Sequence, residues 1–313
     1  MRDGIAWLRF QALSALAFVV ACQPTTVRQT GKAQERPPPL RLGYTPSEEI
    51  VADREAAAIA LAGYIERELD QDVEVVRTAR YGTAVEAMRR GEIDLMPLGP
   101  FAYVLASARG LAEAVAVTGH DASGPRRYAS MIVAHRRTGI RKLDELPARA
   151  AALRLNFTDP ASNSGHLAPR ARLTRLGLDP DADFARCAYT RSHSVALFNM
   201  LFDEADVAGV SRSTWLRLVE KNRLPPEEFF VLWESDPMPN GPMAIRASAP
   251  AKVKISIQEA LAALDEREPA TWRKVVQQYE DGTLVYLPCD DSLYDGVRAL
   301  VSAAELPEAA GSH

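Results

Sequence analysis

Cysteine is scarce in this sequence, and its three copies at positions 22, 187 and 289 form no recognisable motif. There is no Cys-x-x-Cys pair and no His-Glu-x-x-His stretch, and the five histidines are not grouped at metal-ligand spacing. We therefore predict neither a metal site nor a cofactor. Cys187 and Cys289 lie far apart along the chain, and this separation leaves open whether they pair.

A large charge excess and a long apolar run are also missing. The 37 basic residues nearly balance the 41 acidic ones, for a formal net charge of −4. Because nucleic-acid-binding proteins usually carry a strong positive excess, nucleic acid is not an expected partner. The apolar run at 12–20 is too short to span a bilayer as a permanent helix, and no Gly-x-Ser-x-Gly motif indicates a hydrolase.

The N-terminus has the pattern of a bacterial lipoprotein precursor. A basic start precedes the apolar run, which ends in Val-Val-Ala-Cys at residues 19–22 and so resembles a lipobox. We predict that residues 1–21 are a signal peptide removed before Cys22, whose thiol takes a diacylglycerol. Residues 22–39 are polar and rich in proline, as expected of a lipid-anchored linker. A cytosolic protein with an apolar start is the alternative, and the proline-rich stretch argues against it.

Apolar periodicity in the rest of the chain alternates between the patterns of strands and helices. Strand patterns occur at 40–44, 73–76, 93–98, 114–118, 131–134, 152–157, 184–189, 207–210, 229–233 and 243–245. Helical spacing occurs at 50–69, 81–90, 101–108, 194–202, 213–219 and most of 251–279. Strands that alternate with helices of this length predict an α/β protein whose sheets are mainly parallel.

One turn is unusually rich in hydroxyl and amide groups. Residues 158–170 read T-D-P-A-S-N-S-G-H-L-A-P-R, and Pro160 ends the preceding strand because it lacks an N–H. Ser162, Asn163 and Ser164 are good N-cap residues before a run with helical spacing. A helix start of this kind suits an anion, because its free N–H groups and its dipole attract negative charge. An ordinary capping turn is the alternative reading of this stretch.

Polar or aromatic residues follow several of the predicted strands, at Tyr44, Tyr81, 162–165, His193 and Ser211. In α/β sheets, ligands usually bind at the carboxyl ends of the strands. Each of these residues alone fits packing or helix capping equally well. Their concentration at equivalent strand ends predicts a small-molecule site there.

Several stretches together resemble the PhnD-like phosphonate-, phosphite- and phosphate-binding proteins of ABC importers. They are, in the order of that family, residues 80–95, 98–106, 128–133, 159–170, 183–193 and 233–242. The resemblance implies the type II periplasmic binding protein fold, in which two α/β lobes with mixed, mainly parallel sheets are joined by hinge strands. Lobe 1 would comprise residues 40–128 and 238–313, and lobe 2 would comprise residues 129–237. The hinge crossings would lie near 127–132 and 232–239.

The same resemblance implies which side chains hold the ligand in the cleft between the lobes. The implied ligand-binding residues are Tyr81, Tyr128, Ser162, Asn163, Ser164, Gly165 and His193. The sequence departs from the family pattern at Asn163, where threonine is usual. Family members that bind aminoalkylphosphonates carry acidic residues where Ser213 and Gly241 align here. Unless Asp206 or Asp236 substitutes, a cationic ligand tail would lack a partner, and Arg212 nearby would favour a neutral or anionic ligand.

The resemblance implies a monomeric solute-binding lipoprotein, located in the periplasm or at the cell surface and anchored through Cys22. It would deliver a small phosphorus oxyanion to an ABC permease of the inner membrane, with no catalytic residue and no cofactor. A domain that senses the same ligand for a membrane signalling protein is one alternative. The other is a secreted hydrolase that uses Ser162 or Ser164 with His193, although the nucleophile motif of such enzymes is absent.

Overall fold

The computed structural model describes residues 37–45, 51–79, 81–121, 123–276 and 284–304. The predicted signal peptide, Cys22 and the linker as far as residue 36 lie outside the described residues. The same is true of the side chain of Tyr81. Within the described ranges, no helix is both long enough and apolar enough to cross a membrane.

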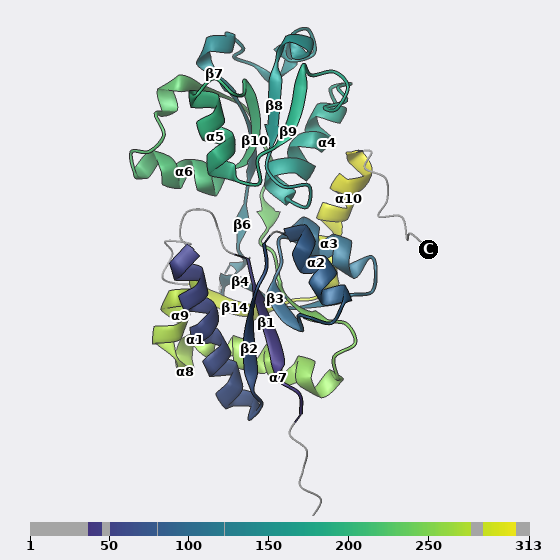
Figure 1. The fold of residues 1–313 in the computed structure, drawn as a ribbon, viewed down its shortest axis with the longest axis vertical. Helices are drawn as coiled ribbons and strands as arrows, with labels where there is room; N and C mark the ends of the chain where they lie inside the picture. Colours follow the sequence, from purple (N-terminus) through teal and green to yellow (C-terminus); the bar gives the residue numbers. More distant parts are fainter. Residues whose placement is uncertain (1–36, 46–50, 80, 122, 277–283, 305–313) are drawn as a thin grey trace, which may run out of the picture. The chain divides into compact units, whose positions relative to one another are not determined.

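The first of two large sheets has seven strands (Figure 1). Its order is β14-β4-β13-β3-β1-β2, and β5 pairs with β4 outside this path. The strands are β1 (Leu40–Tyr44), β2 (Val73–Arg77), β3 (Leu95–Pro97), β4 (Ala112–His120), β5 (Gly124–Pro125), β13 (Met243–Arg246) and β14 (Val285–Pro288).

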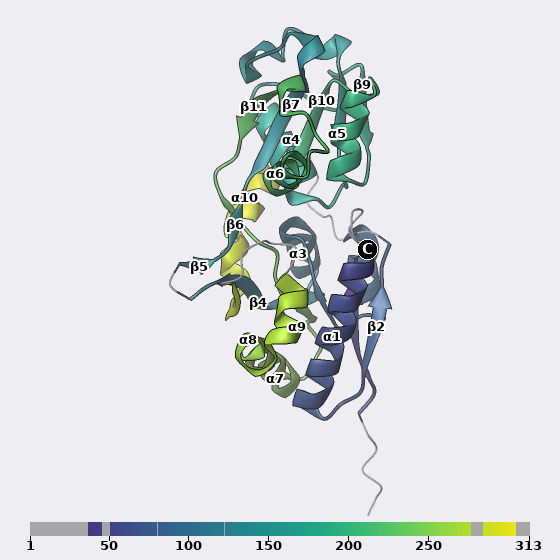
Figure 2. The same ribbon diagram turned by 90° about the vertical axis from the view of Figure 1, so that its left-hand side faces the viewer.

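Helices cover both faces of this sheet. On one face α1 (Val51–Leu69) contacts α7 (Ala251–Ala262) and α9 (Pro269–Val276), with α8 (Leu264–Arg267) between them in the chain, as Figure 2 shows. Their apolar side chains form one core with the strands. On the other face lie α2 (Tyr81–Arg89), α3 (Pro100–Ser107) and α10 (Asp295–Ala303), whose buried residues form a second core. The burial of two opposite faces explains why these strands are apolar along their length.

The second large sheet has five strands in the order β11-β7-β10-β8-β9. They are β7 (Ser130–His135), β8 (Arg154–Phe157), β9 (Arg186–Tyr189), β10 (Val207–Ser211) and β11 (Phe229–Glu234). The helices that accompany it are α4 (Ala168–Thr174), α5 (His193–Leu201) and α6 (Arg212–Glu220). Two apolar clusters, one on each face, bury the side chains of its central strands.

Strand direction differs from the prediction of mainly parallel sheets, which is wrong. Among the described strands, four pairings are parallel and seven are antiparallel. The physical reason lies in the connections, because a parallel pair needs a crossover between its strands. β7 and β13 each follow a short extended segment rather than a helix, and β7 runs antiparallel to β10 and β11 while β13 runs antiparallel to β3 and β4. β14 is likewise antiparallel to β4.

Two short strands connect the sheets. β6 (Arg127–Tyr128) leads into β7, and it pairs antiparallel with β12 (Met238–Pro239), which follows β11. The chain therefore passes from the seven-stranded sheet to the five-stranded one at β6 and returns at β12. Both passages fall where the resemblance places hinge crossings.

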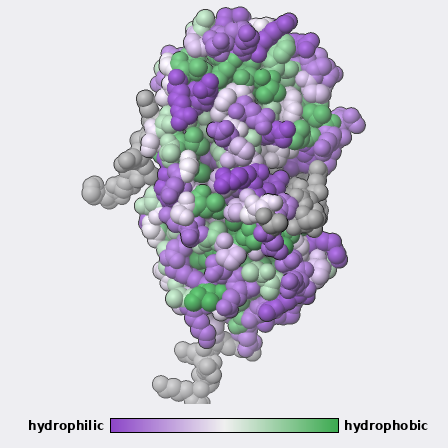
Figure 3. Space-filling model, turned by 180° about the vertical axis from the view of Figure 1, so that it is seen from behind, coloured by the Kyte–Doolittle hydropathy of each residue, from purple (hydrophilic) through white to green (hydrophobic). Residues whose placement is uncertain are grey.

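The predicted strands and helices are present in the described part of the chain, with boundaries shifted by a few residues. The sequence analysis missed β5, β6, β12, β14 and α10, of which the first three have only two residues each. The surface is mixed, and Figure 3 shows hydrophobic residues in scattered patches among hydrophilic ones on one face. Among the large hydrophobic side chains that the structure describes, that of Phe202 has the highest exposed fraction, at 76%.

Candidate functional site

The hydroxyl-rich turn is built by its own side chains. After β8 ends, the carboxylate of Asp159 accepts a hydrogen bond from the N–H of Ala161 at 2.8 Å, and its carbonyl accepts one from Ser162 at 2.8 Å. Ser162 then caps the next helix, because its Oγ accepts the N–H of Gly165 at 3.0 Å. The first turn of that helix, Asn163–Leu167, is π-helical, and α4 continues from it.

Glycine is required at position 165 for steric reasons. A Cβ there would lie 1.9 Å from Oγ1 of Thr158, whose N–H donates to the Gly165 carbonyl at 2.9 Å. The end of β8 and the helix start therefore approach each other more closely than any side chain would permit. The close approach fixes the position of the turn relative to the sheet.

The polar side chains of this turn are buried, with exposed fractions of 7% for Ser162 and 3% each for Asn163 and Ser164. The carbonyl of Ser164 accepts a hydrogen bond from Oγ of Ser130 at 2.7 Å. Ser130 is the first residue of β7, and its own N–H donates to Oγ of Ser235 at 2.9 Å. The turn is thereby held to the strand that directly follows β6.

The structure brings one further predicted site residue, Tyr128, to this turn. Nδ2 of Asn163 lies 3.2 Å from Oη of Tyr128 on β6 and 3.3 Å from Sδ of Met238 on β12. The amide of Asn163 thus bridges the π-helical turn and both strands of the two-stranded sheet. A polar group of the turn is in this way coupled to the segments through which the chain changes sheets.

His193 occupies the first position of α5, after the N-cap Ser192. Its Nδ1 accepts the N–H of Ser211 at 3.0 Å, which requires the proton of the neutral ring to be on Nε2. Desolvation, with the positive charge of Arg217, lowers the pKa of His193 to about 4. The ring is half-buried. At neutral pH it is therefore an uncharged donor through Nε2–H.

His166 is a supporting residue that the sequence analysis did not single out. It is 3% exposed, its Nδ1 donates to the carbonyl of Pro160 at 2.8 Å, and its Nε2 accepts from the hydroxyl of Tyr189 at 3.1 Å. Burial lowers its pKa to about 4, so the neutral ring holds the Asp-Pro segment of the turn in place. A histidine inside the helix that follows the turn was the signal available in the sequence.

The groups considered for a cationic ligand tail have other roles in the structure. Asp206 bonds to Arg154 at 2.8 Å and Arg137 at 3.0 Å, and although burial raises its pKa, these bonds lower it to about 2. Arg212, for which a cleft position was considered, pairs with Glu234 at 3.0 Å. At Gly241 a Cβ would lie 1.8 Å from the carbonyl oxygen of Leu98, so no side chain fits without a backbone shift. Asp236 is exposed and Ser213 is half-buried.

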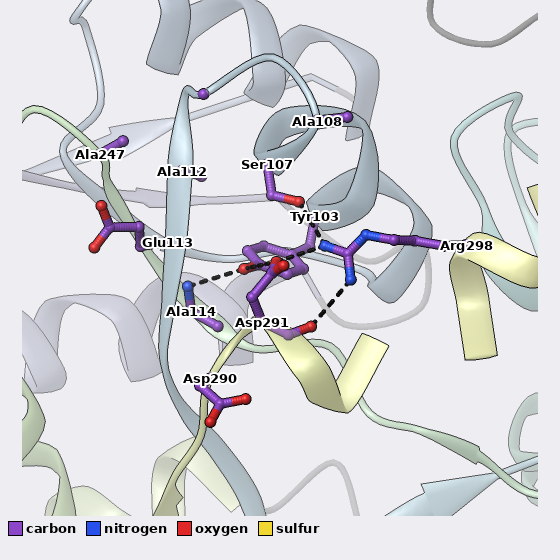
Figure 4. Close-up of a pocket in the computed structure, with 11 residues that line it drawn as sticks. Tyr103, Ser107, Ala108, Ala112, Glu113, Ala114, Ala247, Asp290, Asp291 and Arg298 are labelled. Atoms are coloured by element: carbon purple, nitrogen blue, oxygen red, sulfur yellow. Dashed lines mark hydrogen bonds and ion pairs between the residues drawn. The ribbon is translucent and has the colours of Figure 1, made fainter. Parts of the chain in front are cut away.

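A second polar cluster lines a cavity of about 560 Å³ beside α3, β4 and α10 (Figure 4). At its centre Oδ1 of Asp291 accepts the hydroxyl of Tyr103 at 2.7 Å and Nη2 of Arg298 at 2.5 Å. Arg298 also donates to Asp295 at 2.8 Å and to Ser107 at 3.1 Å. Although burial raises the pKa of Asp291, these hydrogen bonds keep it below its ordinary value. Of the predicted site residues whose side chains the structure describes, none lines this cavity.

The remaining chemically reactive groups are not arranged for catalysis. Ser162 accepts a cap bond, and the ring nitrogen of His193 that could act as a base accepts a backbone N–H instead. Cys187 and Cys289 are free thiols, and burial, with nearby Asp181 and Asp290 respectively, raises the pKa of each to about 12. In the parts of the chain that the structure describes, no group of histidine, cysteine and carboxylate side chains could hold a metal ion.

A family model described as ABC transporter, phosphonate, periplasmic substrate-binding protein matches residues 42–294 of this chain. The phosphate-import protein PhnD of Mycolicibacterium smegmatis is 25% identical over 296 residues, which cover 89% of this chain and 89% of that protein. These matches involve nearly the whole of the described structure rather than one motif.

Solved structures share the fold. A binding protein component of an ABC phosphonate transporter from Pseudomonas aeruginosa gives a TM-score of 0.71 at 21% identity, over 86% of this chain and 87% of that one. PhnD1 from Prochlorococcus marinus, in complex with methylphosphonate, gives a TM-score of 0.70 at 14% identity, over 84% and 97% respectively. The predicted fold class, a two-lobed type II periplasmic binding fold, is confirmed. The predicted direction of the strands is the exception, because most strand pairs are antiparallel.

Proposed function

Because this chain belongs to the family of periplasmic substrate-binding proteins of phosphonate ABC transporters, we propose that it captures a small phosphorus oxyanion and delivers it to an ABC importer. The family consists of transport proteins rather than enzymes. The observation that carries the proposal is the run of three buried polar residues, Ser162, Asn163 and Ser164, at the start of a helix. A membrane sensor remains the alternative use of such a domain.

The proposed site holds the anion with neutral donors. Its residues are Tyr81, Tyr128, Ser162, Asn163, Ser164, Gly165 and His193. Backbone N–H groups at a helix start and the hydroxyls of the turn suit anionic oxygens, and Nε2–H of His193 adds a donor whose tautomer is fixed by Ser211. Hydrogen bonds of this kind to a charged oxygen are stronger than those between neutral groups.

The two sheets belong, in this proposal, to two lobes that close around the ligand. Residues 40–128 and 238–313 form lobe 1, and residues 129–237 form lobe 2. Closure by rotation about a few residues is the mechanism by which periplasmic binding proteins enclose their ligands. β6 and β12 pair with each other, so the two chain segments about which the lobes would rotate are adjacent.

Thermal unfolding with a panel of oxyanions tests the function. A ligand that binds only the folded state raises the melting temperature, and the increase grows with the logarithm of the ligand concentration once this exceeds the Kd. We expect phosphate, phosphite or methylphosphonate to do so, while nucleotides and amino acids leave the melting temperature unchanged. If no phosphorus oxyanion stabilises the protein at millimolar concentration, the proposed function is wrong.

The ligand is proposed to lack a cationic tail. Asp206 is engaged with two arginines, and Gly241 has no room for a carboxylate. An ammonium group would therefore be desolvated without a countercharge. In calorimetric titrations we expect methylphosphonate to bind about tenfold or more tightly than 2-aminoethylphosphonate, which corresponds to roughly 1.4 kcal/mol. Tighter binding of the aminoalkyl compound would contradict this assignment.

Membrane attachment through Cys22 is the last part of the proposal, and it rests on the lipobox-like stretch at 19–22. We expect Cys22→Ser to abolish diacylglyceryl transfer and to release the protein from the membrane fraction. Mass spectrometry of the mature N-terminus is the direct measurement. An N-terminal peptide that begins before residue 22, or an unmodified thiol at Cys22, would refute it.

A further inference from the structure

One buried acceptor of the proposed site has no donor in the protein. The side chain of Asn163 is 3% exposed, and its Oδ1 has no hydrogen-bond partner among the described residues. A buried carbonyl oxygen without a donor is unfavourable, and native proteins rarely leave one unpaired. The NH2 group of the same amide does have partners, since Nδ2 donates hydrogen bonds to Oη of Tyr128 and Sδ of Met238.

The neighbours of the amide fix which of its ends is the oxygen. The sulfur of a methionine can accept a hydrogen bond but cannot donate one. Because Sδ of Met238 lies 3.3 Å from one end of the amide, that end must be the NH2 group. Rotation of the amide by 180° would still allow the hydroxyl of Tyr128 to donate to Oδ1, but it would place Oδ1 against the sulfur of Met238 with no proton between these two acceptors. The position of Oδ1 is therefore fixed as an acceptor on the turn that carries Ser162 and Ser164.

We propose that Oδ1 of Asn163 accepts a hydrogen bond from a hydroxyl group of the bound oxyanion. The site then selects ligands that keep a P–OH group, such as hydrogen phosphate or the monoanion of an alkylphosphonate, over sulfate and alkylsulfonates. This inference rests on the proposed function and makes its specificity explicit. The remaining oxygens of the anion receive the donors of the turn and of His193.

The expected discrimination follows from an asymmetry in hydrogen bonding. A sulfonate has the shape and charge of a phosphonate monoanion but offers only acceptors. Its oxygen would face Oδ1 of Asn163 without a proton between them, and both groups would be desolvated. Sites built to bond a ligand hydroxyl reject analogues that lack it far more strongly than apolar pockets reject a missing methylene. We expect at least a hundredfold preference for the phosphonate.

Three histidines and one tyrosine near the turn stay uncharged in the pH range where the ligand titrates. Burial lowers the pKa of His135, His166 and His193, and it raises that of Tyr103. Above neutral pH these histidines are uncharged and the tyrosine keeps its proton. Titratable or charged side chains occur on the turn, on the elements packed against it and at two proposed site residues. They are His166, Arg170, Arg172, His135, Tyr103, Asp295, Arg298, Tyr128 and His193.

The test measures the affinities for methylphosphonate and methanesulfonate by calorimetry near pH 7. It uses the wild-type protein and two variants whose new side chains have the same shape as each other. Asn163→Thr keeps a hydroxyl that can accept a hydrogen bond, whereas Asn163→Val has none. Because this hydroxyl can also donate to a sulfonate, we expect Asn163→Thr to retain the affinity for the phosphonate but to reject the sulfonate less strongly than the wild-type protein does. In Asn163→Val we expect the preference for the phosphonate to fall by about ten- to a hundredfold, chiefly through weaker phosphonate binding.

Each outcome separates the inference from the proposed function. Equal wild-type affinity for the two ligands overturns the inference and leaves anion capture intact. A preference that Asn163→Val retains also overturns it, as expected if an internal water supplies the missing donor. If the wild-type protein binds neither ligand nor phosphate nor phosphite, the proposed function itself fails.

A pH series on the wild-type protein keeps the inference testable if Asn163→Val does not fold. From about pH 7 to about pH 9, where the lowered pKa values of His135, His166 and His193 and the raised pKa of Tyr103 keep these groups uncharged, methylphosphonate loses its last proton. We expect its affinity to fall by up to about tenfold per pH unit above that ionisation, while methanesulfonate shows no such decline. If the affinity for methylphosphonate changes with pH in the same way as the affinity for methanesulfonate, this result contradicts the requirement for a proton on the ligand.

Discussion

The molecule contains two polar clusters that are built differently, one at the turn of residues 162–165 and one in the cavity around Asp291. In the cavity cluster, charged groups satisfy each other, since Asp291 bonds to Tyr103 and Arg298, and Arg298 also bonds to Asp295. In the turn, the buried Oδ1 of Asn163 has no donor among the described residues. The cavity of about 560 Å³ therefore lies beside the cluster whose charged groups already have partners.

In our proposal the ligand binds at the turn and not in the cavity, so the cavity volume does not by itself identify the site. Charged groups that already have partners gain less from a ligand, which would have to displace those interactions. A buried polar atom without a partner gains a hydrogen bond when a complementary ligand arrives. The comparison predicts that substitutions in the turn change affinity, whereas substitutions in the cavity change stability.

The largest expected effect is on the turn. Replacing both Ser162 and Ser164 by alanine removes two hydroxyl donors to a charged oxygen, each worth roughly 1.5–3 kcal/mol. We expect the affinity for the best phosphorus oxyanion to fall about a hundredfold or more. Loss of the cap that Ser162 provides should lower the free energy of unfolding by only about 1 kcal/mol. Calorimetry and thermal unfolding measure the two effects separately.

The matched control for this double variant is Asp290→Ala in the cavity. Asp290 also caps a helix, because its carboxylate accepts the N–H of Ser292 at 2.9 Å. We expect a similar loss of stability with unchanged ligand affinity. A double variant of the turn that melts early but binds normally would make the turn a plain capping structure and remove the contrast between the two clusters.

The second effect is the response of the two clusters to acid. The pKa of His166 is about 4 in the folded protein and about 6.5 when unfolded, so the unfolded state binds more protons between these values. Stability should therefore decline as the pH falls from about 6.5 to about 4, by on the order of 3 kcal/mol from this residue. Because the pKa of Asp291 is lowered, the stability that this carboxylate contributes is lost only at more acidic pH, below the ordinary pKa of a carboxyl group.

Denaturant titrations at several pH values measure this contribution. We expect His166→Gln, which retains a donor for the carbonyl of Pro160, to show a shallower decline between pH 6.5 and 4 than the wild-type protein. His135 and His193 have lowered pKa values as well and contribute to the wild-type slope. Identical slopes for the two proteins would show that His166 does not hold the turn as a neutral ring.

The smallest expected effect is in the cavity. The side chain of Asp291 is 60% exposed, so solvent screens its pairing with Arg298. We expect Asp291→Ala to lower the free energy of unfolding by about 1 kcal/mol and to leave the affinity for phosphorus oxyanions unchanged. Chemical unfolding and calorimetry of the variant provide the check. A tenfold loss of affinity would show that this cavity takes part in binding.

Much of the fold was accessible from the sequence because it depends on local patterns. The spacing of apolar residues predicted a helix at 50–69 and a strand at 207–210, which the structure has at 51–69 and 207–211, and Pro160 predicted the end of β8. Strand direction was not accessible, because it depends on where connections lead rather than on any residue within a strand. The prediction of mainly parallel sheets failed for this reason at β4 and β13.

The sequence by itself also determined the chemistry of the turn, since Ser162, Asn163 and Ser164 are consecutive and their donors and acceptors are intrinsic to the side chains. Only the tertiary structure decided which of these groups is already used. The bonds from Asn163 to Tyr128 and Met238 join residues 35 and 75 positions apart. The tautomer of His193 likewise depends on the N–H of Ser211, 18 positions away. Such assignments require distances between remote residues, which folding alone establishes.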